Sequence, residues 1–487
     1  MPLAAAKKES SLEPARKALE RLRRAAGDAA TDIRAVSSIL AGISSIAARR
    51  GPMALVRRRR SFEWVRDQGK PREFLARFLA HRTGYQRRAV AYLLSRVARS
   101  MVEHLDAYFE HPERCVLHED LVPAEIFTAM GLVPWMCEML GIMVPLLNPD
   151  MGERAIDAAE NAGTPPDVCS LPKVSMGLVL SGQMPKPVAV VSSNMPCDGG
   201  MTSYGVIRKA IGVPAFYLDV PFHFYSERAE DYFVEELKRL IAWLEETTPG
   251  RMDWDRLREV CEERNRAVEY EIALWDLAAR KPAPLAAEPV YFSHLIFMCT
   301  YPGTPESTEV FRTMVDFAQK AVAKGEPALA EERYRAALWN PPTLSCADLW
   351  VWAEKRWGVA GIMDMLTYNR QPFIDTKSPE SMLRGLARII MQGPMARHTR
   401  GPQENFFNDL FHLYERFSLD MIWMAGHVGC KNTMALNGIF REKCRERDIP
   451  LLNIRYDLAD RRIVSPPDVK AQVDSFMETV MKASPLS

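Results

Sequence analysis

The spacing of apolar residues divides the chain into a helical first part and a mixed remainder. Over residues 1–110, Ala- and Arg-rich stretches such as LEPARKALERLRRAA repeat apolar positions at helical intervals. From about residue 120, short β-branched runs alternate with amphipathic helical segments. Strands that alternate with helices are typical of parallel sheets, so we expect an α/β fold with an N-terminal helical extension.

Two regions carry a strand–helix–strand pattern. In the first, PKPVAVVSSN (185–194) predicts a buried strand, 197–212 a helix and VPAFYLDVPF (213–222) another strand. In the second, we expect strands at RYRAALWNPP, GVAGIMDMLTY, DMIWMAGH and IPLLNIRYD, with helices between them. The similarity of the halves predicts two doubly wound, flavodoxin- or Rossmann-like domains that face one another across a central cleft.

A proline-rich break and an uneven charge distribution define the expected domains. KPAPLAAEP at 281–289 is the candidate boundary, so we predict a helical extension over 1–115, a first α/β domain with two long helices over 116–285, and a second over 286–487. Residues 1–110 carry 23 basic and 11 acidic residues, and the remainder carries 40 and 51. No nucleic-acid motif accompanies the basic segment RRGPMALVRRRR, so we interpret it as solvated surface rather than as a nucleic-acid site.

Composition indicates a soluble protein without disulfides. The chain is 47% hydrophobic and 26% charged, and its apolar runs are too short to span a bilayer. The first residues lack the apolar stretch of a secretory signal, so we expect a cytoplasmic protein that does not insert into membranes. In that compartment the nine cysteines are expected to be free thiols or metal ligands.

Three cysteines share one kind of position. Cys197 and Cys430 each follow a predicted strand and open a helix, and Cys169 precedes another helix. We expect a helix N-terminus to favour the thiolate, which binds metal. The spacing matches neither a zinc finger nor a ferredoxin, but three thiolates suit a four-iron cluster with one iron left open. His427 is a conceivable fourth ligand, although a packing role is preferred. Buried apolar roles are expected for Cys115, Cys261, Cys299, Cys346 and Cys444.

A set of short segments runs from about residue 120 to the end of the chain, in a fixed order and spacing. These segments are VPAEIFTAMGLVP, PPDVCSLPK, SSNMPCDGGMTSY, VPAFYLDVPF, KPAPL, ERYRAALWNPP, HVGCKN and IPLLNIRYDLADRRIVSPPDVKAQVDSFMET. Their order and spacing together resemble the 2-hydroxyacyl-CoA dehydratase family, which includes 2-hydroxyglutaryl-CoA dehydratase and the catalytic subunits of ATP-dependent benzoyl-CoA reductase.

The resemblance implies an enzyme with a cofactor and partners. Family members hold a [4Fe-4S] cluster between two α/β domains, and its cysteines fall on Cys169, Cys197 and Cys430. The family also implies a homologous second subunit in a heterodimer, an ATP-hydrolysing iron–sulfur activator that supplies one electron, and an acyl-CoA substrate. That electron would reduce the thioester of an (R)-2-hydroxyacyl-CoA to a ketyl radical, which expels the hydroxide from C2 and acidifies the β-proton. The open iron would act as a Lewis acid.

A base is also required, and three residues are candidates. Glu138 falls near a position where larger subunits of the family carry a glutamate that faces the cluster. His118 and Glu119 lie where relatives carry small hydroxyl residues that reach the site. These substitutions, and Cys137 beside Glu138, depart from the family pattern.

Several alternatives stay open at the level of sequence. The chain is expected to be a dehydratase subunit, a subunit of an aryl-CoA reductase that reduces an aromatic ring, or a non-catalytic subunit that relays electrons. A structural zinc site formed by the three cysteines and His427 is a further alternative. The basic N-terminal region is a candidate for docking an acidic partner or the phosphates of CoA.

Overall fold

The computed structural model describes residues 3–67, 71–222, 226–339, 343–364, 367–368 and 372–486. Side chains are described from residue 26 onward, except at 58–60, 66–67, 71–74, 339 and 400 within these ranges. None of the described helices is both long enough and apolar enough to traverse a bilayer.

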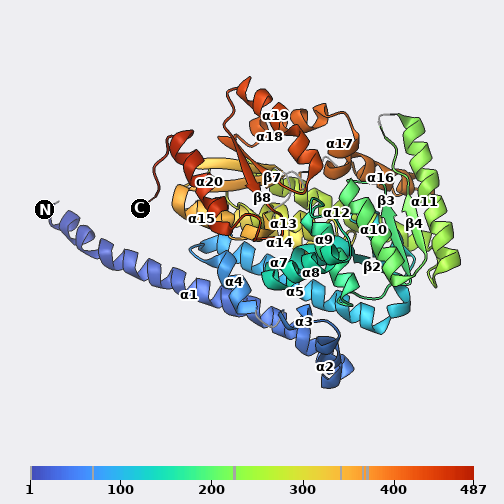
Figure 1. Ribbon diagram of the computed structural model, residues 1–487. Coiled ribbons are helices and arrows are strands. Elements are labelled where there is room, and N and C mark those ends of the chain that lie inside the picture. Colours follow the sequence, from blue (N-terminus) through green and yellow to red (C-terminus); the bar gives the residue numbers. More distant parts are fainter. Residues whose placement is uncertain are drawn as a thin grey trace.

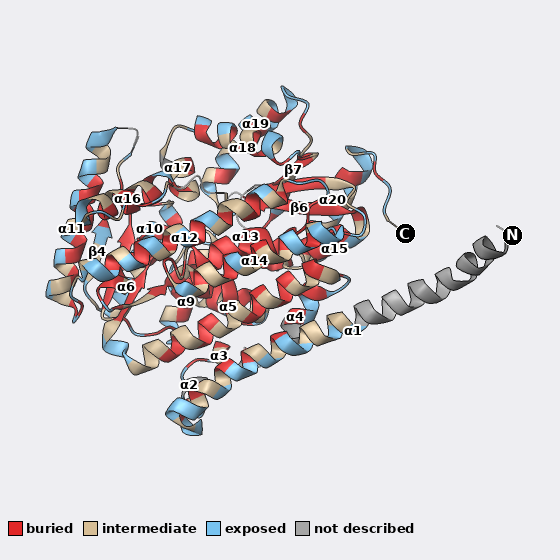
Figure 2. Cartoon of the chain, turned by 180° about the vertical axis from the view of Figure 1, so that it is seen from behind, coloured by how far each residue is buried: buried red, intermediate tan, exposed pale blue. Residues whose placement is uncertain are grey.

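The N-terminal region is helical, as predicted. Helix α1 runs along the outside of α5 (Figure 2) and buries Ala35 and Ile39 in the hydrophobic core. Its outer side leaves apolar residues exposed, such as Ile33 and Leu40. The helices of this region are α1 (Leu3–Arg50), α2 (Pro52–Ser61), α3 (Trp64–Asp67), α4 (Pro71–Leu79) and α5 (Gly84–Glu110).

The first sheet has four parallel strands in the order β2-β1-β3-β4. Its strands are β1 (Cys115–His118), β2 (Val133–Met136), β3 (Ala189–Ser193) and β4 (Ala215–Leu218). The sequence predicted β3 and β4 but not β1 and β2. The associated helices are α6 (Ala124–Ala129), α7 (Cys137–Leu147), α8 (Pro149–Asn161), α9 (Ser170–Leu180), α10 (Asp198–Ile211), α11 (Glu227–Thr247) and α12 (Trp254–Ala278).

The second sheet repeats this arrangement. Its four parallel strands have the order β6-β5-β7-β8, which is the same path from strand to strand as in the first sheet. They are β5 (Tyr334–Trp339), β6 (Val359–Asp364), β7 (Met421–His427) and β8 (Leu451–Tyr456). All four were predicted, although residues 340–342 of the first predicted strand and 365–366 of the second lie outside the described part. The repeated order confirms the prediction of two doubly wound sheets.

Helices fill the space between the sheets. Figure 1 shows β3 and β4 toward one end of the body and β7 and β8 toward the other, with α12, α13 and α14 between them. The remaining helices are α13 (Glu288–Phe297), α14 (Pro305–Lys324), α15 (Leu349–Trp357), α16 (Pro379–Gln392), α17 (Pro394–Arg400), α18 (Glu404–Arg416), α19 (Lys431–Arg445) and α20 (Pro466–Thr479), with short 3-10 turns at Pro112–Arg114 and Leu344–Cys346.

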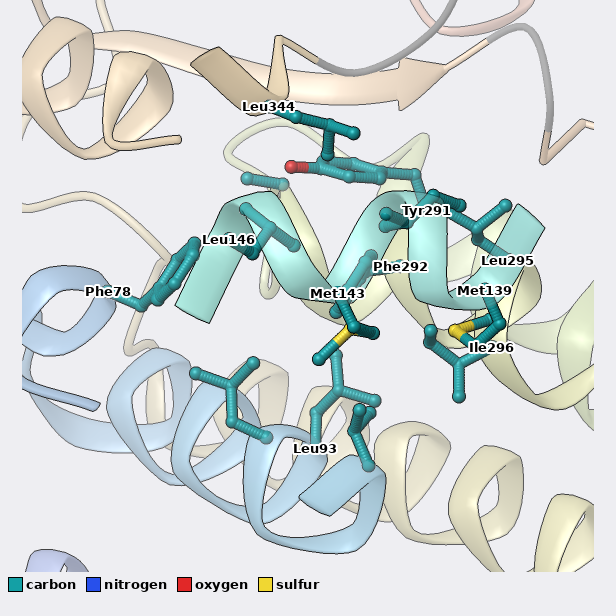
Figure 3. Close-up of a cluster of buried hydrophobic side chains, with 14 of the residues drawn as sticks. Phe78, Leu93, Met139, Met143, Leu146, Tyr291, Phe292, Leu295, Ile296 and Leu344 are labelled. Atoms are coloured by element: carbon teal, nitrogen blue, oxygen red, sulfur yellow. The ribbon is translucent and has the colours of Figure 1, made fainter. Parts of the chain in front are cut away.

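One hydrophobic core joins the two halves. In Figure 3, Met143 of α7 points toward Leu93 of α5, and side chains of α13 such as Phe292 pack close by. Helix α16 comes from the second half of the sequence but packs against α11 of the first. The halves are therefore held in a defined relation, which positions residues from both around one cavity.

Candidate active site

The three singled-out cysteines each occupy the N-cap of a helix. Cys169 precedes α9, Cys197 precedes α10, and Cys430 precedes α19. Cys197 follows β3 and Cys430 follows β7. In each sheet the strand order reverses beside that strand, and doubly wound sheets bind ligands at the carboxyl ends of the strands at this reversal. The fold therefore delivers Cys197 and Cys430 to equivalent ligand-binding positions of its two sheets.

Close backbone packing brings these positions together. A Cβ atom added to Gly429 would lie 2.7 Å from Cα of Cys169, so the loops before α19 and α9 touch. A Cβ on Gly199 would lie 3.7 Å from Cβ of Cys169, which places the start of α10 beside the same residue. All three thiols line a cavity of about 1120 Å³, a volume that includes open solvent at its mouth. Residues from both halves of the chain therefore form this cavity.

Burial, rather than helix position, governs the thiol pKa values of Cys169 and Cys197. We expected the helix N-termini to favour thiolates, but burial raises the pKa of Cys169 well above its ordinary value, and the charges of Cys197 and Cys430 raise it further. Burial likewise raises the pKa of Cys197 to about 12, although the backbone amide of Gly200 acts in the opposite direction. A bound metal offsets the effect of burial on these pKa values, because a thiol that coordinates a metal is deprotonated outright.

His427 supports one of the thiols and is not placed as a ligand. The backbone amide of Leu458 donates to its Nδ1 at 3.2 Å, so the ring proton is on Nε2. Nε2 lies 3.0 Å from Sγ of Cys169 and donates to it. Burial lowers the pKa of His427 to about 4, so the ring is neutral at physiological pH. The sequence favoured a role for His427 in supporting a ligand or in packing, and its hydrogen bond to Cys169 is a supporting contact.

The donor set fits a cluster better than a single ion. Thiolates select iron–sulfur clusters or zinc, and structural zinc needs four ligands that converge on one point. Within the described ranges, no three His, Cys, Asp or Glu side chains are arranged to hold one metal ion. A cluster binds each cysteine through a different iron atom, so its ligands need not converge. Three thiols facing one cavity therefore suit a cluster with an iron left free of protein ligands.

Glu138 reaches the same cavity from the first turn of α7. The hydroxyl of Tyr204 lies 2.8 Å from both of its carboxylate oxygens. Burial and the charge of Asp120 raise the pKa of Glu138 to about 8. A carboxyl group with such a pKa can hold or release a proton near neutral pH.

His118 and Glu119 lie behind the cavity rather than in its lining. His118 ends β1, is fully buried, and its Nδ1 donates to the carbonyl of Glu119 at 2.8 Å. Burial lowers its pKa to about 4. Glu119 accepts hydrogen bonds of 2.7 Å from both the amide and the hydroxyl of Ser193, so it links the ends of β1 and β3.

Asp120 is the residue of this loop that reaches the cavity, and the sequence did not point to it. It lines both the cysteine cavity and an adjoining, largely apolar cavity of about 700 Å³. Burial raises its pKa to about 6. Its position just past the carboxyl end of β1 is a signal of function, but β1 itself was not predicted.

Comparison with known proteins agrees with this architecture. The family model described as 2-hydroxyglutaryl-CoA dehydratase, D-component, matches residues 121–480. A benzoyl-CoA reductase subunit of Thauera aromatica is 24% identical, over 66% of this chain and 78% of that protein. The alpha subunit of lactoyl-CoA dehydratase from Anaerotignum propionicum is 21% identical, over 66% of this chain and 81% of that protein. The chain therefore belongs to the 2-hydroxyglutaryl-CoA dehydratase D-component family, as its sequence motifs indicated.

Proposed function

We propose that this chain is one subunit of a [4Fe-4S] enzyme that eliminates water from an (R)-2-hydroxyacyl-CoA, with Cys169, Cys197 and Cys430 as the cluster ligands. The observation that carries the proposal is the convergence of these thiols, from both halves of the chain, on one cavity that Glu138 and Asp120 also line. When bound, the cluster would supply an electron to the thioester and a Lewis-acidic iron.

The chain's own residues account for the other requirements. His427 donates to the sulfur of Cys169, which favours the thiolate. Lys431 at the start of α19 pairs with Asp198 at the start of α10, with Nζ and Oδ2 2.9 Å apart. This ion pair joins the two halves in the wall of the cavity. Glu138 and Asp120 are the groups in this cavity that we propose to handle protons.

A second candidate function is reduction of an aryl-CoA ring. It is favoured by the similarity to the benzoyl-CoA reductase of Thauera aromatica, which at 24% identity is as great as the similarity to the lactoyl-CoA dehydratase. Both reactions use the same ligands and the same kind of electron delivery. In either case we propose a homologous second subunit and an ATP-hydrolysing activator as partners, in a cytoplasmic heterodimer. A third possibility is that this subunit only relays electrons.

Metal analysis of the protein purified without oxygen tests the cluster ligands. We expect about four irons and four sulfides per chain, with an EPR signal after reduction, and loss of both in Cys197→Ser. Cys444→Ala is the matched control, because Cys444 is a buried cysteine of α19 outside the cavity lining. A colourless parent protein, or one with a single zinc ion, would contradict the assignment.

Turnover assays separate the two reactions. The reconstituted enzyme with its partner subunit and activator is given a 2-hydroxyacyl-CoA and, separately, an aryl-CoA. Enoyl-CoA formation supports dehydration, and a cyclic diene product supports ring reduction. If neither product forms although the cluster is intact, the result would support a relay role.

The basic N-terminal region is proposed to dock an acidic partner surface or the phosphates of CoA. Arg57 is exposed on α2, whereas the side chains at 58–60 lie outside the described part. Neutralising Arg57–Arg60 is expected to weaken assembly in native mass spectrometry or to raise the KM for the CoA ester. Unchanged assembly and KM would dispose of this proposal.

A further inference from the structure

A buried tyrosine joins Glu138 to the end of β1. The side chain of Tyr204 is buried, and its hydroxyl lies 2.8 Å from each oxygen of Glu138 and 2.9 Å from the carbonyl of His118. A hydroxyl has one proton to donate. When Glu138 is ionised, the tyrosine hydroxyl donates its hydrogen bond to the carboxylate, and the carbonyl of His118 no longer accepts one. When Glu138 is protonated, it donates to the tyrosine oxygen, and the tyrosine donates to His118. Tyr204 can therefore hydrogen-bond to Glu138 in both states, and its hydrogen bond to the ionised carboxylate acts to lower the pKa of Glu138.

The other surroundings of Glu138 act in the opposite direction and favour a retained proton. Glu119 and Asp120 lie beside it, and burial raises the pKa of all three carboxyl groups. Among the described residues, no Lys or Arg is a principal cause of these pKa shifts. Glu119 is buried and Glu138 and Asp120 are half-buried, so the proximity of the three carboxyl groups disfavours the state in which all are ionised. The ionisable groups that face Glu138 are Glu119, Asp120, Tyr204 and Cys137, and across the cavity Cys169, Cys197, Cys430, His427 and Lys431.

Resting on the proposed dehydration, we propose that Glu138 and Asp120 form an acid–base pair in which Tyr204 tunes the acid, Glu138. Glu138 is the acid that protonates the departing hydroxyl group. Asp120, which faces the cysteine cavity and the adjoining apolar cavity at once, is the base that removes the β-proton. Tyr204 is a positioning residue that keeps a hydrogen bond to Glu138 in both protonation states. The lower pKa of Asp120, about 6, against about 8 for Glu138 agrees with these roles.

The proton balance closes over one turnover. The C2–O bond of the substrate breaks, and the hydroxide leaves as water with the proton of Glu138. The β-C–H bond breaks, its proton passes to Asp120, and the C2–C3 double bond forms. The electron lent by the activator is recovered, so the elimination is redox-neutral. Proton transfer from Asp120 back to Glu138 restores the starting state.

Infrared spectroscopy of the purified chain tests the protonation directly. At pH 7 we expect a protonated-carboxyl C=O band of Glu138 that the difference spectrum against Glu138→Gln isolates from any band of Glu119, and that is retained in Asp120→Asn. In Tyr204→Phe its titration should move up by about one pH unit, because the ionised form loses the stronger, charge-assisted hydrogen bond. Tyr92→Phe, which removes a hydroxyl on α5 outside the cavity lining, should leave the titration unchanged. An ionised Glu138 at pH 7 would overturn the proposal.

Kinetics of the assembled enzyme test the roles. Glu138→Gln and Asp120→Asn should each lower kcat by roughly 10²- to 10⁴-fold at unchanged iron content. Tyr204→Phe should shift the alkaline limb of the kcat–pH profile upward in parallel with the infrared titration. Turnover of Asp120→Asn at the parent rate would refute the base assignment. The infrared titration measures the protonation of Glu138 without turnover. If the enzyme does not dehydrate any substrate, the proposed function fails, but the proposed protonation of Glu138 can still be confirmed or refuted.

Discussion

Substituting Gly429 by alanine is expected to damage both the fold and the cluster site. The new Cβ would meet Cα of Cys169 at 2.7 Å, its amide nitrogen at 3.0 Å and the carbonyl carbon of Val168 at 3.1 Å. Ordinary contacts begin at 3.4 Å, so the two loops must separate by about 0.7 Å. All three contacts are backbone atoms, which cannot rotate away. We expect a loss of about 1–3 kcal/mol, the usual cost of overpacking.

Gly438→Ala provides the matched control on the helix that follows. A Cβ at this position would have no atom within 4 Å, and Gly438 lies inside α19. Alanine there should stabilise the protein by about 0.5–1 kcal/mol, because glycine weakens a helix interior. The two variants are compared by urea unfolding and by iron content after anaerobic purification. We expect Gly429→Ala to lose iron as well, because it moves Cys169 relative to Cys430. If both variants retain iron and unfold at the same urea concentration, close packing of the two loops is not required for stability or for iron binding.

Two further predictions concern buried charges away from the cavity. The guanidinium of Arg82 lies 2.5 Å from both Glu288 and Glu354, and all three side chains are almost completely buried. Arg82→Met removes the guanidinium from two buried carboxylates, although Nε2 of His81 stays 3.6 Å from Glu354. The substitution should cost about 3–5 kcal/mol in urea unfolding. The cost should be smaller at pH 5 than at pH 8, because the carboxylates can then take up protons, and a cost under about 1 kcal/mol would contradict the prediction. Burial opposes protonation of His294, but the charge of Glu271 outweighs it and raises the pKa of His294 to about 10. Because this pKa lies above the ordinary 6.5, the pair stabilises the fold fully below pH 6.5 and ceases to do so as the pH rises through 10. Unfolding free energies measured from pH 6.5 to 10 should therefore fall more steeply in the parent than in His294→Gln, and equal slopes would refute the pairing.

The length of the apolar run around each strand, rather than of the strand itself, decided whether the sequence could predict it. Strands β5 to β8 are six or seven residues long and are bounded by turn residues, so their apolar runs stand out. Strands β1 and β2 have only four residues each, and β2 contains a proline; β4 is as short, but it lies within the longer run VPAFYLDVPF. Such short runs give no reliable period, which is why they were not predicted. Missing β1 also hid Asp120, whose significance comes from its place at the end of that strand.

Sequence alone determined the elements that carry the candidate ligands. Cys197 and Cys430 each stand between an apolar run and a helical pattern, and both the strand and the helix are local properties of a few residues. The repeat of the strand–helix pattern similarly indicated two similar sheets. The motifs shared with the family indicated its membership, because their order along the chain can be read without coordinates.

Only the tertiary structure decided which groups meet. The tautomer of His427 depends on an amide 31 residues away, and the hydrogen bonds of Glu138 depend on Tyr204, 66 residues away. Burial, which reverses the expected pKa of Cys169, results from packing by both halves of the chain. Contacts and desolvation of this kind arise from segments far apart in sequence, and no local pattern of residue types encodes them.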